Sequence, residues 1–502
     1  MIESIEASPL YPIANPKSIA LFGASNNASS MGTSLLDSVL DLGFEGEIYP
    51  IHLKEAQVQN LKAYRSVLDL PKVPDLALIV LPTRLVPETV DACGRKGIKH
   101  AIVISGGFKE VGGNGVELEK DLVAAAKKHG MRFLGPNCIG VANPRRKLNT
   151  TFMTLEGGPG FIGMASQSGS FVTQMFTYLS HYALGFSTAF SVGNEANIDI
   201  VDCMEYLAAC PDTKVIALYI EGIRRGRAFV ETARSIVPKK PIVAFYIGGS
   251  EAGSRAGLSH TGALAGPDRL YDGIFRQSGI VRARSIMELF DYCWILGSLP
   301  RSTGRSVLIQ THSGGPGAEA ADACGRAGLE LPSLSPETIK RLRPLMPQTG
   351  SISNPLDFTF GKNLTDYFSE IPKALLEEKN GDYLLFYFFT PSRRLKRILR
   401  QVGVPPDHVA EQAAKLVNFQ SDAILRLIET HDKPFVGYSY QSVTDQLLRR
   451  LVERGVPIFL GPERAARAIE AANRYTCLRG KMLASASHEE AAPGEKRTGS
   501  MR

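Results

Sequence analysis

Short apolar segments alternate with longer amphipathic segments along most of this chain. The short segments are rich in Val, Ile and Leu and have the length of buried β-strands, whereas the longer ones have the spacing of helices. This alternation predicts α/β domains with mainly parallel sheets. Three sets of it follow one another, separated at residues 143–147 and 298–304 by polar segments that we interpret as linkers.

The predicted strands recur within each of the three sets. In the first set they cover 18–22, 46–51, 76–80, 100–104 and 132–134, with helices at 85–96 and 115–129. In the second set they cover 160–165, 186–192, 215–220 and 241–247, followed by a helix at 285–297. In the third set they cover 306–310, 383–389, 435–438 and 457–460, before a helix at 462–475. From about Arg479 the composition turns polar and aperiodic, so we predict that residues 480–502 are a disordered tail.

Length and composition agree with a soluble protein of several domains. A chain of 502 residues is long enough for about three domains. With 44% hydrophobic and 21% charged residues it is neither disordered nor fibrous. Its apolar runs are shorter than the ~18–20 residues of a membrane-spanning helix, and its first residues lack the pattern of a signal peptide. We therefore expect a cytoplasmic protein without a membrane partner.

The net charge limits the expected ligands, and the cysteine content limits the expected disulfides and metal sites. The net charge of +7 is mild, and no basic stripe interleaved with aromatic residues is present, so we expect no nucleic acid and favour an anionic small molecule. The seven cysteines are odd in number and form no CxxC pair. We expect reduced thiols that act as small core residues, with no disulfide framework and no metal site.

The first candidate site follows the first predicted strand. Gly23-Ala24-Ser25-Asn26-Asn27 leads from this strand towards a helix, which is how Rossmann-type domains present backbone N–H groups to a phosphate. The G-x-G-x-x-G spacing is absent, and a tight turn is the alternative. Lys54 follows the second strand, where a nicotinamide-binding domain would carry an acid. A cation there disfavours an oxidoreductase and suits coenzyme A with its additional phosphate, unless Lys54 is merely solvated.

The second candidate site is a histidine in a glycine-rich segment, 248–266. His260 is the group in this segment that is best suited to chemistry, because imidazole is a nucleophile near neutral pH and can carry a phosphoryl group. No His or Cys lies at the spacing of a metal ligand. The alternative is a surface histidine without a function.

Two strand-to-helix junctions and one acid complete the candidates. Ser168-Gly169 and Ser313-Gly314-Gly315 each begin a predicted helix, whose N-terminal dipole of about +0.5 charge would stabilise a phosphoryl group. Each is also explained as an ordinary N-cap. Their similarity hints at an internal repeat. Glu221 ends a predicted strand and could hold one imidazole nitrogen, or it could be a solvated acid.

Together these residues resemble the α subunit of ADP-forming (NDP-forming) acyl-CoA synthetases, relatives of succinyl-CoA synthetase. The resemblance covers about residues 8–476. It rests on the motifs Gly23-Ala24-Ser25-Asn26, Gly135-Pro136-Asn137-Cys138-Ile139-Gly140, Ser166-Gln167-Ser168-Gly169, Ser259-His260-Thr261-Gly262-Ala263-Leu264-Ala265-Gly266, Ser313-Gly314-Gly315-Pro316-Gly317 and Asn354-Pro355-Leu356-Asp357.

The resemblance implies a fold, a reaction and a role for each site residue. It implies a Rossmann-like CoA-binding domain at 8–143 and two flavodoxin-like domains at 148–300 and 305–476. The reaction interconverts acyl-CoA, ADP and phosphate with a carboxylic acid, CoA and ATP, through an acyl phosphate and a phosphohistidine. His260 would carry the phosphoryl group, Glu221 would orient it, and the two Ser-Gly helix starts would hold it. The CoA site would comprise Gly23, Ala24, Ser25, Asn26, Asn27 and Lys54, with Pro82, Ile104, Ser105 and Gly106 as further walls.

Two departures from the family pattern qualify these roles. Before the histidine segment the family has Lys-x-Gly-Arg, whereas this chain has Tyr246-Ile247-Gly248-Gly249. Two expected cations are therefore absent, and we expect either the acid substrate or the affinity for phosphate to differ. None of the three sets has the pattern of an ATP-grasp module. We therefore expect a separate ATP-grasp β subunit, in a heterodimer or heterotetramer, to bind ADP or ATP and Mg²⁺. The alternative function is a non-catalytic CoA-binding or regulatory protein of the same fold, and the identity of the small carboxylic acid stays open.

Overall fold

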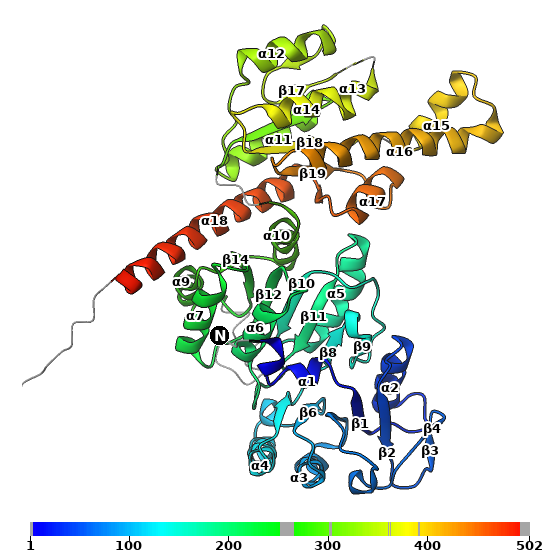
Figure 1. The fold of residues 1–502 in the computed structure, drawn as a ribbon, viewed down its shortest axis with the longest axis vertical. Helices are drawn as coiled ribbons and strands as arrows, with labels where there is room; N and C mark the ends of the chain where they lie inside the picture. Colours follow the sequence, from blue (N-terminus) through cyan, green and yellow to red (C-terminus); the bar gives the residue numbers. More distant parts are fainter. Residues whose placement is uncertain are drawn as a thin grey trace, which may run out of the picture.

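The computed structural model describes residues 4–250, 266–300, 304–359, 361, 363–389 and 392–491. Three larger sheets organise these residues, and a short hairpin of β3 (Gln57–Val58) and β4 (Leu61–Lys62) lies beside the first of them. Figure 1 shows the three domains stacked along the long axis in chain order.

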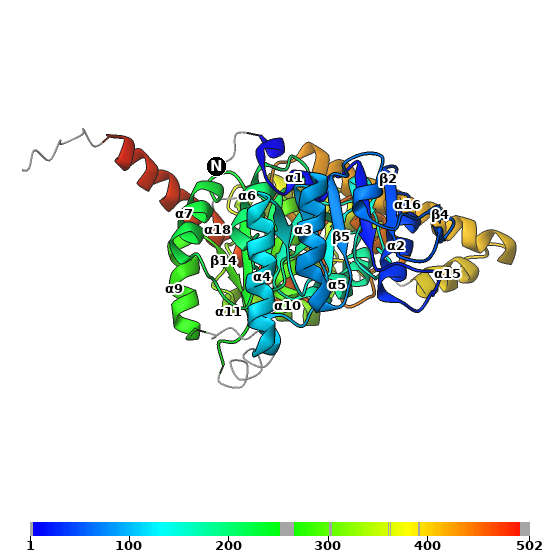
Figure 2. The same cartoon turned by 90° about the horizontal axis from the view of Figure 1, so that it is seen from below.

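The first sheet is parallel throughout. It contains β1 (Ser18–Phe22), β2 (Glu47–Ile51), β5 (Leu76–Ile79), β6 (His100–Val103) and β7 (Arg132–Leu134), in the order β2-β1-β5-β6-β7. Its helices are α2 (Met31–Asp41), α3 (Val86–Lys96) and α4 (Asn114–Lys128). Helices α3 and α4 pack side by side on the face that points away from the second domain (Figures 1 and 2). All five strands predicted for this set are present.

The second sheet has five parallel strands and an antiparallel extension. The parallel strands are β10 (Ile162–Ser166), β11 (Phe186–Ser191), β12 (Val215–Ile220), β13 (Ile242–Tyr246) and β14 (Val281–Ala283). The sheet continues from β11 into β8 (Gly140–Asn143) and β9 (Leu148–Asn149). Its helices are α5 (Gly169–His181), α6 (Ile200–Ala209), α7 (Gly226–Ile236), α9 (Asp268–Ser278) and α10 (Ile286–Ser298).

The antiparallel extension corrects the interpretation of residues 143–147 as a linker. These residues connect β8 to β9, with a single 3₁₀ turn at Pro144–Arg146, and both strands belong to the second sheet. A domain boundary at residue 143 would therefore cut through a hairpin. The two strands are too short to produce a detectable alternation, whereas the Pro-Arg-Arg-Lys composition of the turn indicates a loop.

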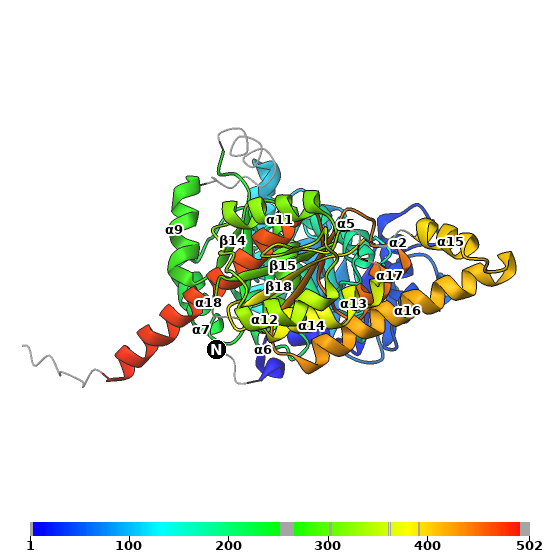
Figure 3. The ribbon, with the colours of Figure 1, turned by 90° about the horizontal axis from the view of Figure 1, so that it is seen from above.

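The third sheet repeats the arrangement. Its parallel strands are β15 (Val307–Thr311), β17 (Leu356–Asp357), β18 (Tyr383–Tyr387), β19 (Phe435–Ser439) and β20 (Ile458–Leu460), and β16 (Ser351–Ile352) pairs antiparallel at the edge. Its helices are α11 (Gly314–Arg326), α12 (Pro336–Leu342), α13 (Leu364–Phe368), α14 (Glu370–Glu377), α15 (Ser392–Gln401), α16 (Pro406–Thr430), α17 (Gln446–Glu453) and α18 (Pro462–Ala491). Figure 3 shows α11 on one side of this sheet and α12 and α14 on the other, while α15 and α16 project away from it.

All three sheets share one strand order. When the parallel strands of each sheet are numbered along the chain, the order is 2-1-3-4-5, which is the doubly wound order of flavodoxin-like domains. The predicted α/β class is confirmed. In such sheets the chain reverses direction across the sheet at the first strand, and ligands bind at the carboxyl end of that strand. The three places in question follow β1, β10 and β15, and each is one of the loops that the sequence singled out.

Helix α18 joins the third domain to the second. It packs against α10 and α11, and Figure 1 shows it running between the two domains. It continues to Ala491, so the prediction of a disordered tail from residue 480 is wrong for residues 480–491. The segment 481–491 contains Lys, Met, Leu, Ala and Glu and neither Gly nor Pro, so its residues favour a helix without needing a buried face. Residues 492–502 lie outside the described part of the chain.

The cysteines behave as core residues. All seven are unpaired, and six are buried, leaving only Cys477 exposed. Among the helices that the structure describes, none combines the length and the apolar character needed to cross a membrane.

Candidate functional site

The loop after β1 depends on two glycines. Gly23 has φ +101°, and a Cβ there would lie 2.0 Å from the carbonyl oxygen of Val80. A Cβ on Gly32, in the first turn of α2, would lie 2.3 Å from the backbone of Gly23. Since no side chain fits at either position, the N-terminal turn of α2 packs directly on the end of β1.

Hydrogen bonds fix the rest of this loop. Thr33 Oγ1 donates to Ser25 O at 2.9 Å and accepts from Ser25 N at 3.1 Å. Asn26 Nδ2 donates to Gln57 O at 3.0 Å, and Gln59 N donates to Asn26 Oδ1 at 2.9 Å. The β3–β4 hairpin therefore holds the loop from outside. Ala24 is buried beneath it, and Asn27 is exposed at its end.

The remaining predicted CoA residues lie along the same edge of the sheet. Lys54 is exposed after β2, Pro82 follows β5, and Ile104, Ser105 and Gly106 follow β6. Ser105 Oγ donates to Leu81 O at 2.6 Å and accepts from Leu81 N at 3.0 Å, which ties the ends of β5 and β6 together. The structure thus gathers all ten predicted positions at the carboxyl edge of the first sheet. A phosphate would there meet loop backbone, the start of α2 and a cation, a donor set that fits CoA.

The two Ser-Gly junctions have the same construction. Ser168 is the N-cap of α5, and Ser313 is the N-cap of α11, yet neither side chain caps its own helix. Instead Ser166 Oγ donates to Ser168 O at 2.7 Å, and Thr311 Oγ1 donates to Ser313 O at 2.9 Å. A hydroxyl two residues upstream shapes each turn, and the N-cap side chain does not accept from the first N–H groups of the helix. Gly169 is half-buried, and Gly314 and Gly315 are exposed. The hinted repeat is therefore a repeat of local structure.

Glu221 follows β12 and lies beside Gln167, which follows β10. Gln167 Oε1 accepts from Glu221 N at 2.5 Å and from Gly222 N at 2.9 Å, while its Nε2 donates to Gly222 O at 2.7 Å. The Gln167 amide thereby makes three hydrogen bonds to the backbone of Glu221 and Gly222. These residues border a cavity of about 160 Å³, which is lined by Lys109, Gln167, Gly193, Asn194, Glu195, Glu221, Gly222, Ile223, Arg224 and Tyr271.

Several residues of this cavity wall were missed at the sequence level, among them Lys109, Arg224 and the pair Asn194 and Glu195. Asn194 and Glu195 follow β11, and Gln167 Nε2 donates to Glu195 Oε2 at 2.9 Å. Glu195 is buried, and burial raises its pKa to about 8. The signal was available, because the two residues follow a predicted strand just as Glu221 does. The sequence pattern does not reveal that Asn194 contacts the first domain. Asn194 Nδ2 donates to Glu110 Oε2 at 2.6 Å and to Glu119 Oε2 at 2.9 Å.

His260 lies outside the described residues, in the segment 251–265. The flanks of that segment are described. Tyr246, at the end of β13, donates its hydroxyl to Gly266 O at 2.8 Å and stacks on Tyr271 with ring centroids 3.5 Å apart. The two described flanks of this segment therefore lie together at the carboxyl edge of the second sheet. Glu221 and Ser168 are at the same edge.

The same flanks account for the departure from the Lys-x-Gly-Arg pattern. Tyr246 is buried against Tyr271 and does not present a charge. A Cβ on Gly249 would lie 2.2 Å from Asp268 Oδ1. Asp268 is held by Arg282 and by Arg284, whose Nη1 lies 3.0 Å from Asp268 Oδ2. An arginine at position 249 would collide with this ion-paired acid.

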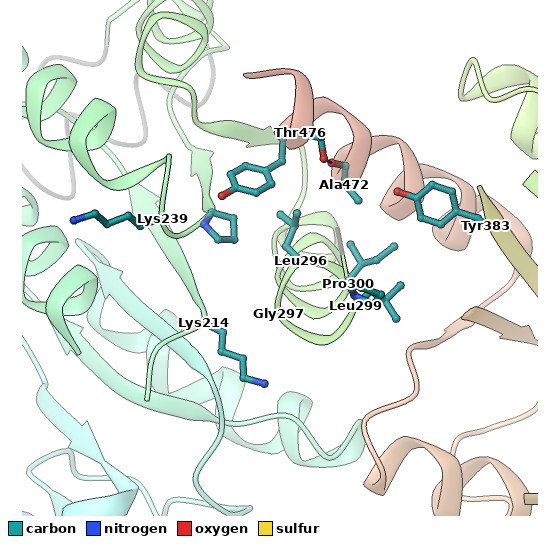
Figure 4. A pocket seen from close by; sticks show the side chains of 12 residues that line it. Lys214, Lys239, Leu296, Gly297, Leu299, Pro300, Tyr383, Ala472 and Thr476 are labelled. Atoms are coloured by element: carbon teal, nitrogen blue, oxygen red, sulfur yellow. Dashed lines mark hydrogen bonds between the residues drawn. The ribbon is translucent and has the colours of Figure 1, made fainter. Parts of the chain in front are cut away.

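A cavity of about 300 Å³ lies elsewhere, between the second domain, the third sheet and α18. Figure 4 shows Lys214, Lys239, Leu296, Tyr383 and Thr476 around it. Lys214 directly precedes β12, so the cavity is at the amino edge of the second sheet, opposite the edge where doubly wound sheets bind ligands. No group of three or more His, Cys, Asp or Glu side chains is placed to hold a metal ion among the residues that the structure describes.

A partly buried acid at the domain interface, Glu119, makes stability depend on pH. Burial, together with the nearby Glu110 carboxylate, raises the pKa of Glu119 to about 7, against a usual value of about 4.3. The folded state therefore binds a proton that the unfolded state releases, and stability falls as the pH rises from about 4.3 to 7. We expect the melting temperature of Glu119→Gln to fall less between pH 5 and pH 8 than that of the wild type. A smaller fall should remain, because the pKa of Glu195 is raised as well. Glu117→Gln, on the exposed side of α4, is the control, and equal slopes in all three proteins would contradict the assignment.

Comparison with known proteins agrees with this architecture. Residues 17–144 match the CoA binding domain, residues 159–296 the succinyl-CoA ligase like flavodoxin domain, and residues 307–410 the ligase-CoA domain. The chain is 37% identical over 458 residues to the α subunit of acetate–CoA ligase [ADP-forming] II of Pyrococcus furiosus, covering 90% of this chain and 95% of the relative. It is 35% identical to acetate–CoA ligase [ADP-forming] I of Archaeoglobus fulgidus, covering 93% of this chain but only 64% of that longer relative.

A solved structure shows the same arrangement. The acetyl-coenzyme A synthetase 1 of Ca. Korarchaeum cryptofilum, described as dinucleotide forming and in complex with phosphate and ADP, superposes with a TM-score of 0.82. The two chains are 31% identical, and the match covers 95% of this chain and 98% of the other. The chain therefore belongs to the ADP-forming acyl-CoA synthetases, as an acid–thiol ligase with the domain content of an α subunit.

Proposed function

We propose that this chain carries the acyl and histidine-phosphoryl steps of the ligase reaction, with His260 as the phosphorylated residue. In the direction of ATP synthesis, phosphate would displace CoA from the acyl-CoA to give an acyl phosphate, and the imidazole would then take the phosphoryl group and release the carboxylic acid. The observation that carries the proposal is the carboxyl edge of the second sheet. Glu221, the uncapped start of α5 and both ends of the histidine segment meet there.

Each group at this edge has a task that its chemistry supports. Glu221 would accept a hydrogen bond from one imidazole nitrogen and leave the other free to attack phosphorus. The N–H groups at Ser168-Gly169 would stabilise the phosphoryl oxygens when His260 faces the acyl site. The matching start at Ser313-Gly314-Gly315 would do the same from the third domain. CoA would supply the thiol that accepts or releases the acyl group, and the loop at Gly23–Asn27 together with Lys54 would bind its phosphates.

The substrate class is a small carboxylic acid. The size and the charge of the cavity beside Glu221 support this. Its volume is only about 160 Å³, and the cationic side chains of Lys109 and Arg224 are part of its lining. Relatives of this chain are named as ligases of acetate and of 4-hydroxybutyrate, although another is named trans-feruloyl-CoA synthase.

The nucleotide and Mg²⁺ would be bound by a partner, an ATP-grasp β subunit. Two relatives that this chain matches over nearly their whole length are named α subunits. The Archaeoglobus relative is longer, and this chain covers only 64% of it, as expected if a further module were fused there. His260 would then be phosphorylated from ATP by the assembled enzyme only.

The experiment is phosphoryl transfer from acetyl [³²P]phosphate to the purified chain. We expect a label that is labile in acid and stable in base, as for phosphohistidine. With [γ-³²P]ATP and Mg²⁺ we expect the same label only after the β subunit is added. A chain that binds CoA but takes no label from either donor would instead be a regulatory CoA-binding protein.

Lys54 provides a separate test of the CoA site. Lys54→Ala should weaken CoA binding by about 10- to 100-fold, because it removes a charge-assisted contact to a phosphate. Labelling of His260 by acetyl phosphate should be unchanged. Lys72→Ala is the matched control, since Lys72 pairs with Glu47 at the opposite edge of the same sheet. Equal CoA affinities of the two variants in a calorimetric titration would show that Lys54 is only a solvated surface residue.

A further inference from the structure

The orientation of the Gln167 side chain decides how Glu221 is held. An amide has an acceptor end and a donor end, and Gln167 turns its oxygen towards the N–H groups of Glu221 and Gly222. The reverse orientation would bring its NH₂ group against two other donors. The two backbone N–H groups and Gly222 O, which accepts from Gln167 Nε2 at 2.7 Å, therefore favour this orientation.

Glu195 reinforces this orientation. Its Oε2 accepts from Gln167 Nε2 at 2.9 Å, so it holds the NH₂ end of the amide while the backbone of Glu221 and Gly222 holds the oxygen end. The other oxygen, Oε1, accepts from Ile200 N at 3.0 Å. Both ends of the Glu195 carboxyl group are thus committed, one to the start of α6 and one to Gln167.

The backbone of Glu195 is itself held in an unusual conformation. Its φ is +52°, in the left-handed region that residues other than glycine rarely adopt. Arg224 Nη1 donates to Glu195 O at 2.7 Å. The preceding residue, Asn194, is fixed by Glu110 and Glu119 of the first domain, and Lys109 Nζ donates to Asn194 O at 2.6 Å. Contacts from two domains therefore set the place of one buried carboxyl group.

We infer that Glu195 is a positioning residue of the phosphoryl-transfer reaction, acting on Glu221 through Gln167. Glu195 does not touch the reacting atoms. It stabilises the amide orientation in which Gln167 holds the Glu221–Gly222 backbone, and so it supports the place at which the Glu221 carboxyl group would meet the imidazole. The inference rests on the proposed function, in which Glu221 orients His260. Because Asn194 and Glu195 adjoin contacts with the first domain, the docking of that domain becomes a condition for a correctly placed Glu221.

A reversal of donor and acceptor tests this inference. Gln167→Glu keeps the acceptor towards Glu221 and Gly222 but replaces the NH₂ donor at Glu195 with a second carboxyl oxygen. This mismatch is complete only where Glu195 is ionised, so the labelling rates are compared above pH 8. Glu195→Gln places NH₂ against NH₂ at the same contact, while its Oε1 still accepts from Ile200. We expect each single variant to slow the labelling of the chain by acetyl [³²P]phosphate by up to about 100-fold, the cost of a displacement of ~1 Å at a reacting group.

The double variant Gln167→Glu, Glu195→Gln restores a matched pair with the hydrogen bond reversed. We expect it to recover most of the lost rate, although the bond from residue 167 to Gly222 O stays lost. CoA affinity, measured by calorimetry, should stay the same in all four proteins, because the CoA loop is on another sheet.

Each outcome decides something. Recovery in the double variant with constant CoA affinity supports the inference. If the double variant is as slow as the slower single variant, or if CoA affinity and melting temperature fall in step with the rate, the pair is only structural and the inference is overturned. If wild-type chain takes no label, the proposed function fails and the inference fails with it. If wild type is labelled and both single variants are labelled at the same rate, only the inference fails.

Discussion

His260→Asn should abolish ligase turnover, lowering it by about 10⁴-fold or more, because no other group in the glycine-rich segment can form the same phosphoryl intermediate. The asparagine keeps the polarity and most of the size of the side chain but cannot be phosphorylated on nitrogen. Labelling by acetyl [³²P]phosphate should disappear together with turnover. CoA binding should persist, since the residues assigned to it all lie on the first sheet.

The fold should tolerate this change. The segment 251–265 is small and nearly devoid of apolar bulk, so a single polar exchange should alter the free energy of unfolding by less than ~0.5 kcal/mol. His408→Asn, on the exposed N-terminal part of α16, is the matched control and should retain full activity. Near-normal turnover of His260→Asn with the partner subunit present would refute the phosphohistidine mechanism.

Much of the fold follows from the sequence because buried parallel strands have a strong pattern. The apolar segments at 18–22, 132–134 and 215–220 coincide with β1, β7 and β12. Short elements escape this reasoning. Strand β17 has only two residues, and Arg282 interrupts the three residues of β14, so neither stands out as an apolar segment. The common strand order of the three sheets is likewise invisible in the pattern, because it depends on which strands pair.

The site residues that could be predicted are polar residues that directly follow a predicted strand. Ser168 and Glu221 lie at the ends of well-defined strands, and the structure brings both to one edge of a sheet. Glu195 follows a strand too, but its partners could not be predicted. Gln167 reaches it across the sheet, and the contacts of Asn194 with Glu119 join residues 75 positions apart. The first contact joins the ends of two neighbouring strands and the second joins two domains, and the local sequence specifies neither.

The largest stability effect outside the cores should come from one ion pair between α10 and α18. Arg464 Nε and Nη2 lie 2.8 and 2.6 Å from the two carboxylate oxygens of Asp291, and Nη2 also donates to the hydroxyl of Tyr178 at 3.1 Å. Only 4% of Asp291 is exposed. Asp291→Ala leaves a largely buried guanidinium without a counter-charge, so we expect a destabilisation of about 3–5 kcal/mol by guanidinium denaturation.

The destabilisation of Asp291→Ala should come from the unpaired, largely buried charge of Arg464, and not from the loss of the attraction itself. We therefore expect the double variant Asp291→Leu, Arg464→Met to recover most of the lost stability, because apolar groups of similar volume replace buried ion pairs well. Asp322→Ala, which breaks an exposed pair with Arg326 on α11, should change stability by less than about 0.5 kcal/mol. If Asp291→Ala were as mild as Asp322→Ala, the contact would be a surface pair. Since α10 belongs to the second domain and α18 to the third, a loosened contact should also slow turnover, because the two Ser-Gly helix starts belong to the two domains that it joins.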